Sequence, residues 1–136
     1  MTRNPFLTAA MLMTAMVLGA TLALAQDNAA SRDEGQASFN NACRTCHSVK
    51  AGDNRLGPSL AGIVGQKSGS QAGFGYSAAL KDGSVTWDEK TLDAFIANPE
   101  AVAPGNNMKP YTGMTNAEER AKIVAFLKSG GGVTPD

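Results

Sequence analysis

The 136-residue sequence predicts a single domain of helices joined by long loops. Three stretches carry the start signals and apolar spacing of helices, whereas no stretch alternates polar and apolar residues for long enough to predict a strand. The connections are rich in glycine and long for a compact domain. These observations favour an all-α fold whose loops either act as linkers or wrap closely around a bulky ligand.

The first predicted helix begins at a capping box. Ser31 stands three residues before Glu34, and the helix is expected to run towards Cys43. A short helix is expected further along the chain at residues 77–81.

Two more helices are predicted in the second half of the chain. One starts at Thr86, three residues before a glutamate, and should stop at residues 98–99, where a proline disfavours helix. The other starts at Thr115, again three residues before a glutamate, and should end before Gly130.

Residues 1–25 predict a secretory signal peptide. This segment holds one charge, Arg3, and ends in an A-x-A pattern that favours cleavage after Ala25. The alternative is an uncleaved membrane anchor, because the apolar run approaches the roughly 20 residues that span a bilayer. After cleavage, residues 26–136 would form the domain, with 11 basic and 12 acidic residues and a formal charge of −1. This balance does not suggest a protein that binds nucleic acid.

The segment CRTCH at residues 43–47 holds both cysteines and the only histidine of the chain. Cys-x-x-Cys-His is the attachment pattern of c-type haem. One helical turn presents Cys43 and Cys46 to the two vinyl groups at one edge of a porphyrin, where each thiol forms a thioether. His47 then lies under the ring, where its imidazole can bind iron.

Three other interpretations of CRTCH compete with haem attachment. A structural zinc site needs four ligands, and the chain has only three candidate cysteine and histidine ligands. A thioredoxin-like redox pair should follow a strand, whereas CRTCH follows a predicted helix. A structural disulfide would suit an exported protein but leaves His47 without a role.

The chain has no second histidine, so two histidines of this chain cannot both bind the iron, and the methionines are the candidates for a second axial ligand. Four of the six methionines fall in residues 1–25, which leaves Met108 and Met114. A methionine in a loop is ordinarily a core filler. Met108, however, follows Pro104 and Gly105 in a long loop between two helices, so its thioether could swing inward. Ligation by histidine and methionine raises the potential and closes the coordination sphere, which suits electron transfer.

The sequence resembles class I c-type cytochromes, that is, mitochondrial cytochrome c and its bacterial periplasmic relatives. The resemblance runs from about Gly35 to Lys128. It rests on CRTCH, on LGPSLAGIVGQKSG, on GFGYSAAL with the later VTW, and on the methionine loop NPEAVAPGNNM. This last match selects Met108 over Met114.

The resemblance implies a cytochrome c fold around one covalent haem. It implies that His47 donates a hydrogen bond to the Pro58 carbonyl, and that Tyr76 and Trp87 bind a haem propionate. It also implies that the first helix crosses the last one, with Gly35 and Phe39 meeting residues 123 and 126. Haem attachment after export implies a periplasmic protein.

Several positions depart from the family pattern. Glu100 and Asn107 stand where lysine is common in these relatives, so a strongly basic docking face is not expected. Phe95 replaces a tyrosine whose hydroxyl reaches the ligand methionine, and Gln66 replaces an arginine near the propionates. Both changes should alter the reduction potential.

The sequence therefore predicts a monomeric periplasmic electron carrier that cycles haem c between Fe(II) and Fe(III) and is not an enzyme. Its expected partners are redox proteins of a respiratory, photosynthetic or dehydrogenase chain, with no stable membrane insertion after cleavage. The alternative is a haem enzyme or gas sensor in which Met108 binds weakly, because Phe95 lacks the hydroxyl.

Overall fold

The computed structural model describes residues 28–131. Contacts divide the chain after Ser31 into two compact units, and the second unit holds CRTCH together with the helices and loops that follow it. The signal-peptide prediction for residues 1–25 lies outside the described residues. Within residues 28–131, no helix is long and apolar enough to cross a membrane.

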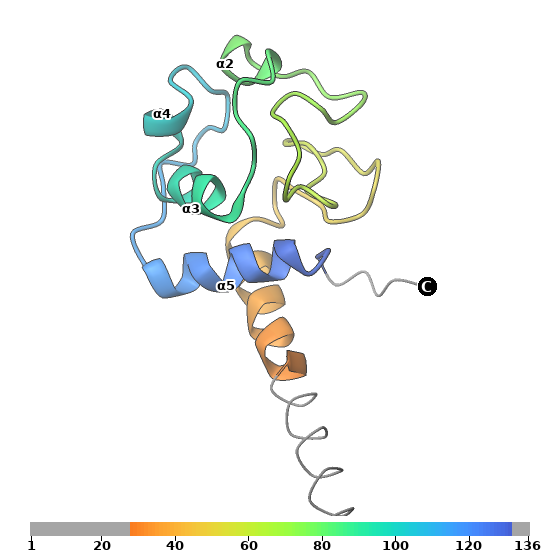
Figure 1. Ribbon diagram of the computed structural model, residues 1–136, viewed down its shortest axis with the longest axis vertical. Coiled ribbons are helices and arrows are strands. Elements are labelled where there is room, and N and C mark those ends of the chain that lie inside the picture. Colours follow the sequence, from red (N-terminus) through yellow and green to blue (C-terminus); the bar gives the residue numbers. More distant parts are fainter. Residues whose placement is uncertain (1–27, 132–136) are drawn as a thin grey trace, which may run out of the picture. The chain divides into compact units, whose positions relative to one another are not determined.

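The second unit is helical, as the sequence predicts (Figure 1). Residues 28–42 are helical, and four labelled helices follow: α2 (Ala78–Lys81), α3 (Glu89–Ala97), α4 (Pro99–Val102) and α5 (Ala117–Lys128). In the described part of the chain, extended pairing is limited to one isolated bridge between Lys67 and Thr86.

The three predicted helix starts were wrong by a few residues. Ser31 lies inside the first helix, which is already formed at residue 28. Asp88 caps α3 in place of Thr86, and Asn116 caps α5 in place of Thr115. In both cases the later residue has the short side-chain oxygen that reaches the amides of the first turn, which is what a cap requires.

The predicted helix ends are confirmed, and one helix was missed. α3 ends at Ala97, and the predicted break contains a second helix, α4, with Pro99 at its first position. Asn98 joins the two, because its amide N–H bonds to Ala94 and its side chain caps α4. Gly130 follows α5 with a φ of +86°, the left-handed conformation typical after a helix.

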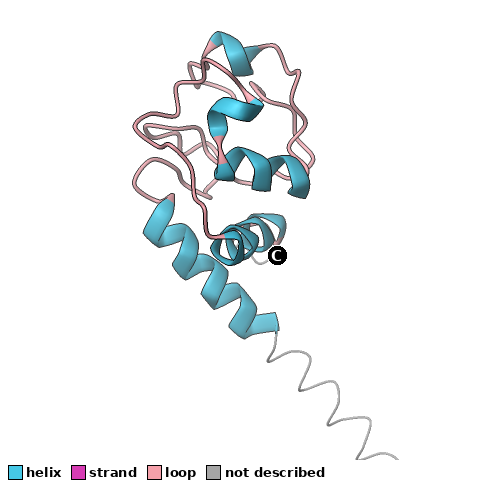
Figure 2. Cartoon of the chain, turned by 90° about the vertical axis from the view of Figure 1, so that its left-hand side faces the viewer, coloured by secondary structure: helices cyan, strands magenta, loops and turns pink. Residues whose placement is uncertain are grey.

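The first helix crosses α5 at a glycine, as the resemblance implies (Figure 2). A Cβ atom on Gly35 would lie 2.7 Å from the Lys122 carbonyl oxygen and 2.8 Å from the Phe126 Cβ, so only glycine allows this approach. Next to the crossing, the rings of Phe39 and Phe126 pack with centroids 5.5 Å apart. Ile123 is fully buried beside them.

The hydrophobic core continues from this crossing to α3. Trp87 and Phe95 pack edge to face with centroids 4.9 Å apart. The Arg120 side chain of α5 holds Asp93 of α3 at 2.8 Å and also donates to the Met114 carbonyl. The packed helices thus fix the positions of the points from which the long loops leave and to which they return.

Candidate functional site

The loops and helices enclose an apolar cavity of about 600 Å³. This volume is within the range of roughly 300–1,000 Å³ found for small-molecule and cofactor sites. CRTCH, α3, α5, and the loops around residues 56–63, 74–76 and 107–111 all contribute to its walls. The long glycine-rich loops therefore wrap a space large enough for a bulky group, as the second of the two sequence hypotheses expects.

CRTCH forms a helical turn that continues from the first helix. The amide of Cys43 bonds to the Phe39 carbonyl at 2.8 Å, and the amide of His47 bonds to the Cys43 carbonyl at 2.9 Å. Cys43, Cys46 and His47 all line the cavity. The turn thus brings the two thiols and the imidazole to one side of one chamber, as their spacing predicts.

The two cysteines are free thiols, and burial keeps Cys43 protonated. Desolvation, with a smaller effect from neighbouring Cys46, raises the pKa of Cys43 to about 11. Within residues 28–131, no group of three or more histidine, cysteine, aspartate or glutamate residues could hold a metal ion. The four-ligand zinc hypothesis therefore has no support in the described chain.

His47 is held in one tautomer and orientation. Its Nδ1 lies 2.8 Å from the Pro58 carbonyl oxygen, and a carbonyl can only accept, so Nδ1 carries the proton and Nε2 keeps its lone pair. Burial lowers the pKa of His47, although the hydrogen bond to Pro58 opposes that effect. A neutral imidazole with a free Nε2 is the form that can bind a metal.

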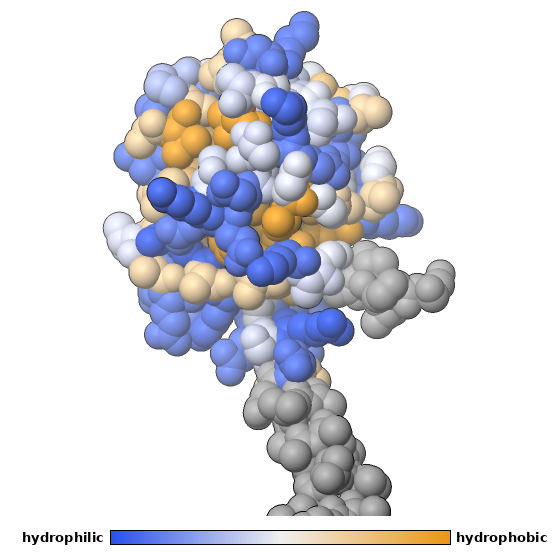
Figure 3. All heavy atoms as spheres, viewed as in Figure 1, coloured by the Kyte–Doolittle hydropathy of each residue, from blue (hydrophilic) through white to orange (hydrophobic). Residues whose placement is uncertain are grey.

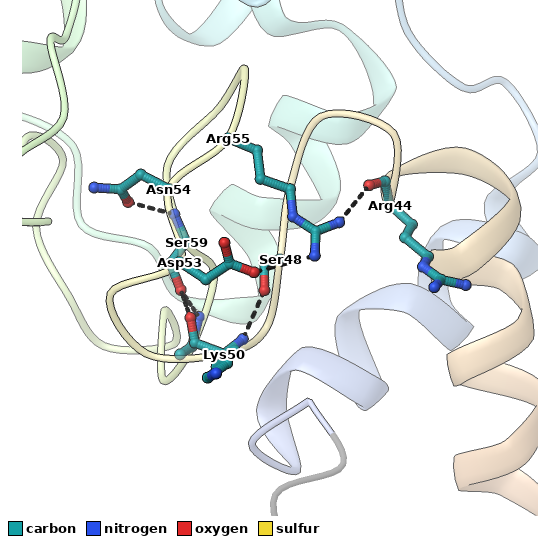
Figure 4. A network of polar contacts seen from close by, with 8 residues as sticks. Arg44, Ser48, Lys50, Asp53, Asn54, Arg55 and Ser59 are labelled. Carbon is teal, nitrogen blue, oxygen red and sulfur yellow. Dashed lines mark hydrogen bonds and ion pairs between the residues drawn. The ribbon is translucent and has the colours of Figure 1, made fainter.

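A polar network fixes the loop that carries Pro58, whose carbonyl accepts the hydrogen bond of His47 (Figure 4). Ser59 donates its hydroxyl to the Lys50 carbonyl at 2.7 Å, and its amide donates to the Asn54 side chain at 3.0 Å. Arg55 reaches back to the Arg44 carbonyl inside CRTCH at 3.2 Å. The Ser59 contacts thus hold the loop in shape, and the Arg55 contact joins it to the CRTCH turn.

Tyr76 and Trp87, for which the resemblance predicts contact with a haem propionate, both line the cavity. The Tyr76 hydroxyl accepts a hydrogen bond of 3.3 Å from the Gln71 amide, which leaves its own proton free to be donated. Burial raises the pKa of Tyr76, so the hydroxyl keeps that proton. Both side chains could donate to a carboxylate bound in the chamber.

Ser77, which the sequence reasoning assigned only to a helix start, is not among the described residues that line the cavity but is next in the chain to one of them. Its hydroxyl is buried and has no hydrogen-bond partner among the described residues. It follows Tyr76 directly, and it does not use its side chain to cap α2. A buried hydroxyl without a partner is costly, and a carboxylate near Tyr76 would satisfy it.

Met108 lines the cavity, and a residue of the same loop holds its backbone in place. Its amide donates to the side chain of Asn106 at 2.9 Å, and Asn106 itself is 2% exposed. Sequence reasoning missed Asn106, because nothing in its local pattern marks a buried asparagine. Met114 is partly buried against the core, as Met108 also is, but it is not among the described residues that line the cavity, and its amide bonds to the Ile96 carbonyl.

The tyrosine hydroxyl that Phe95 lacks is not supplied by another residue of the methionine loop. Tyr111 lies three residues after Met108 and lines the cavity, but its hydroxyl donates to the Ile96 carbonyl at 2.6 Å. Tyr111 thus anchors the loop to α3 and is not free to hold the sulfur. Gln66 bonds to the Gly62 carbonyl and keeps its loop closed.

The model of the cytochrome c family matches residues 32–131, the whole described part of the second unit. The chain belongs to the cytochrome c family. Cytochrome c2 iso-2 of Magnetospirillum fulvum is 47% identical over 87 residues, which cover 64% of this chain and 90% of that protein. Cytochrome c of Chlamydomonas reinhardtii is 43% identical over 95 residues, covering 69% of this chain and 84% of that one.

A solved structure has the same fold. Cytochrome cH from Methylobacterium extorquens superposes with a TM-score of 0.64 at 34% identity, covering 71% of this chain and 96% of that one. As a cytochrome c, the chain is an electron carrier and not an enzyme, and its cofactor is one covalent haem c. Family membership thus does not support the haem-enzyme alternative. Because haem c uses both cysteines of CRTCH for its attachment, it also does not support the thioredoxin-like and disulfide hypotheses.

The residues present fit a haem. The chamber is apolar and of cofactor size, it is lined by two free thiols and a neutral imidazole, and a buried hydroxyl beside it lacks a partner. Phe95 packs on Trp87 within the same wall, where it adds apolar surface.

Proposed function

We propose that this cytochrome c is an exported carrier that moves single electrons between redox proteins in the bacterial periplasm. The observation that carries the proposal is the placing of CRTCH and Met108 in the wall of one apolar chamber. The similarity to cytochrome c2 of Magnetospirillum fulvum supports a bacterial carrier of this type. We expect it to act as a monomer.

In this proposal each predicted site residue has one role. Cys43 and Cys46 would form the thioethers, and His47 and Met108 would bind the iron. Tyr76 and Trp87 donate hydrogen bonds to a haem propionate.

The bound haem would supply a one-electron iron couple, and the protein's contribution is to hold both charge states in nearly the same surroundings. The bond to Pro58 prevents rotation of the His47 ring, and the Asn106 side chain restrains the Met108 backbone. Apolar walls exclude water, so fewer dipoles must reorient when the charge changes.

Export rests on the proposed signal peptide. Residues 1–25 would be removed after Ala25, and haem attachment would follow outside the cytoplasm. Burial keeps the Cys43 thiol protonated in the folded chain, whereas the thiolate is the reactive form of cysteine. We therefore expect the haem to be attached before folding buries this thiol.

A mass spectrum of the protein recovered from the periplasm, after expression with a haem-ligation system, tests the proposal. We expect a chain that starts at Gln26 and carries the added mass of one porphyrin. A double variant, Cys43→Ala with Cys46→Ala, should lose the added mass and keep the cleavage. An intact residue 1–25 segment would indicate an anchor, and an unmodified chain would contradict covalent haem.

Partner binding is expected to depend only weakly on salt. Among the described residues that line the chamber, Lys109 alone carries a permanent charge, and Glu100 neutralises it at 3.2 Å. Arg55, in the neighbouring loop, pairs with Asp53 at 3.1 Å. The side chain of Leu56 is 78% exposed at the chamber and adds an apolar contact. Polar and apolar residues are interspersed over the face shown in Figure 3.

Stopped-flow rates with a redox partner, measured from low to physiological ionic strength, check this prediction. A focused basic patch would make the rate fall steeply as salt rises, because screening removes long-range steering. We expect a change of no more than about threefold, as for a weakly steered encounter. A decrease of an order of magnitude would contradict it.

A further inference from the structure

Glu100 makes three contacts that bracket the proposed ligand Met108. Its carboxylate accepts from the Gly105 amide at 2.8 Å, from the Asn106 side-chain amide at 3.1 Å and from the Lys109 ammonium at 3.2 Å. Gly105 and Asn106 precede Met108, and Lys109 follows it. One carboxylate thus ties together the two sides of the loop that carries the methionine.

Asn106 transmits this contact to the backbone of Met108. Its Nδ2 donates to Glu100 and to the Ala103 carbonyl, at 3.1 and 3.0 Å. With both protons of the amide used on that side, Oδ1 faces the Met108 amide and accepts from it at 2.9 Å. The Glu100 carboxylate and the Ala103 carbonyl together fix which way the buried amide points.

Glu100 lies on α4, a short helix whose position is fixed by its cap and its packing. α4 begins at buried Pro99, is capped by the Asn98 side chain and packs against α3. The hydrogen bond from Gly105, with the Lys109 contact, lowers the pKa of Glu100, so the carboxylate is ionised at neutral pH. At the far end of the loop, the Tyr111 hydroxyl provides a second anchor on Ile96.

We propose that Glu100 is a positioning residue that determines how firmly Met108 is held at the haem iron. This inference rests on the proposed ligand role of Met108. Release of a loop methionine requires the loop to move outward, and that movement breaks the contacts of Glu100 with Gly105 and Asn106.

The competing explanation is that Glu100 makes only a surface ion pair with Lys109. The chain offers a matched control in Glu89, which pairs with Lys128 at 2.6 Å. The side chains of Glu100 and Glu89 are 52% and 54% exposed. Glu89 differs from Glu100 in that its ion pair joins α3 to α5 and does not involve the methionine loop.

The test compares Glu100→Gln, Glu100→Ala and Glu89→Gln in the full haem-loaded protein. Imidazole is added to the oxidised protein, and the rate at which the red Met-to-Fe(III) absorption band disappears is followed by stopped flow. Loss of charge-assisted hydrogen bonds at a half-exposed site should raise this rate roughly threefold to tenfold in Glu100→Gln and further in Glu100→Ala. The rate for Glu89→Gln should stay within about twofold of wild type.

Amide hydrogen exchange gives a direct second readout. The Gly105 amide should exchange faster in both Glu100 variants and at the wild-type rate in Glu89→Gln, because Glu100 is its acceptor among the described residues. Equal band-loss rates in wild type and both Glu100 variants, or equal acceleration in Glu89→Gln, would overturn the proposal while leaving Met108 as ligand. Absence of the band in wild type would instead show that the ligand assignment fails, and the positioning role with it.

Discussion

Replacing Met108 with alanine should leave the haem attached while lowering the reduction potential and opening the iron to external ligands. The thioethers of Cys43 and Cys46 do not involve Met108, so covalent attachment should survive. A thioether ligand favours Fe(II), and its loss should lower the potential by at least about 0.1 V of the roughly 0.8 V that axial ligands span. Potentiometric titration measures this shift.

The matched control is Met114→Ala, the other methionine outside residues 1–25. Met114 packs on the core and does not appear among the residues that line the chamber in the described chain. Its truncation should lower the free energy of unfolding by about 2 kcal/mol and leave the potential and the red absorption band unchanged. Cyanide should bind promptly to Met108→Ala only. The reverse pattern would assign the ligand to Met114.

Gly57→Ala should be among the most damaging single-methyl additions in this chain. A Cβ atom at Gly57 would overlap the His47 ring, 2.7 Å from Nδ1 and 2.8 Å from Nε2. The backbone cannot retreat freely, because the Gly57 amide donates to the Cys46 carbonyl at 2.8 Å. The ring would have to move away from Pro58, so both its orientation and its hydrogen bond should be lost.

Overpacking of this kind costs about 1–3 kcal/mol, more than the roughly 0.4–1 kcal/mol gained by restricting the unfolded chain. Gly35→Ala is the control, since its Cβ meets the Lys122 carbonyl oxygen at the helix crossing and not His47. Both variants should unfold at lower denaturant concentration. Only Gly57→Ala should also change the haem absorption spectrum and reduce the yield of loaded protein. An unchanged spectrum would mean that the imidazole has more room than the structure gives it.

The positions of the helices could largely be predicted from sequence, because apolar spacing and stop signals act over a few residues. The starts were less accurate. Thr86 and Thr115 have the right chemistry, but Asp88 and Asn116 have it too and lie closer to the first-turn amides. α4 was missed because residues 98–99 were interpreted only as the end of α3, although a proline also suits the first position of a helix.

The methionine loop shows where local pattern stops being informative. Glu100 stood out in the sequence only as a missing positive charge, and Asn106 did not stand out at all. Their roles depend on the way α4 turns back towards residues 105–109, which brings a carboxylate, an amide and a lysine together. No rule about spacing along the chain predicts that these three groups come into contact.

The sequence by itself determined the cofactor class and the helical framework, since both depend on short-range geometry: one turn of CRTCH and the periodicity of each helix. Only the tertiary structure showed that Met108, and not Met114, is among the described residues that line the chamber, that the His47 ring leaves Gly57 no space for a side chain, and that Glu100 binds both sides of the methionine loop. Those facts depend on contacts between distant segments. Such contacts arise only when the whole chain packs around one cavity.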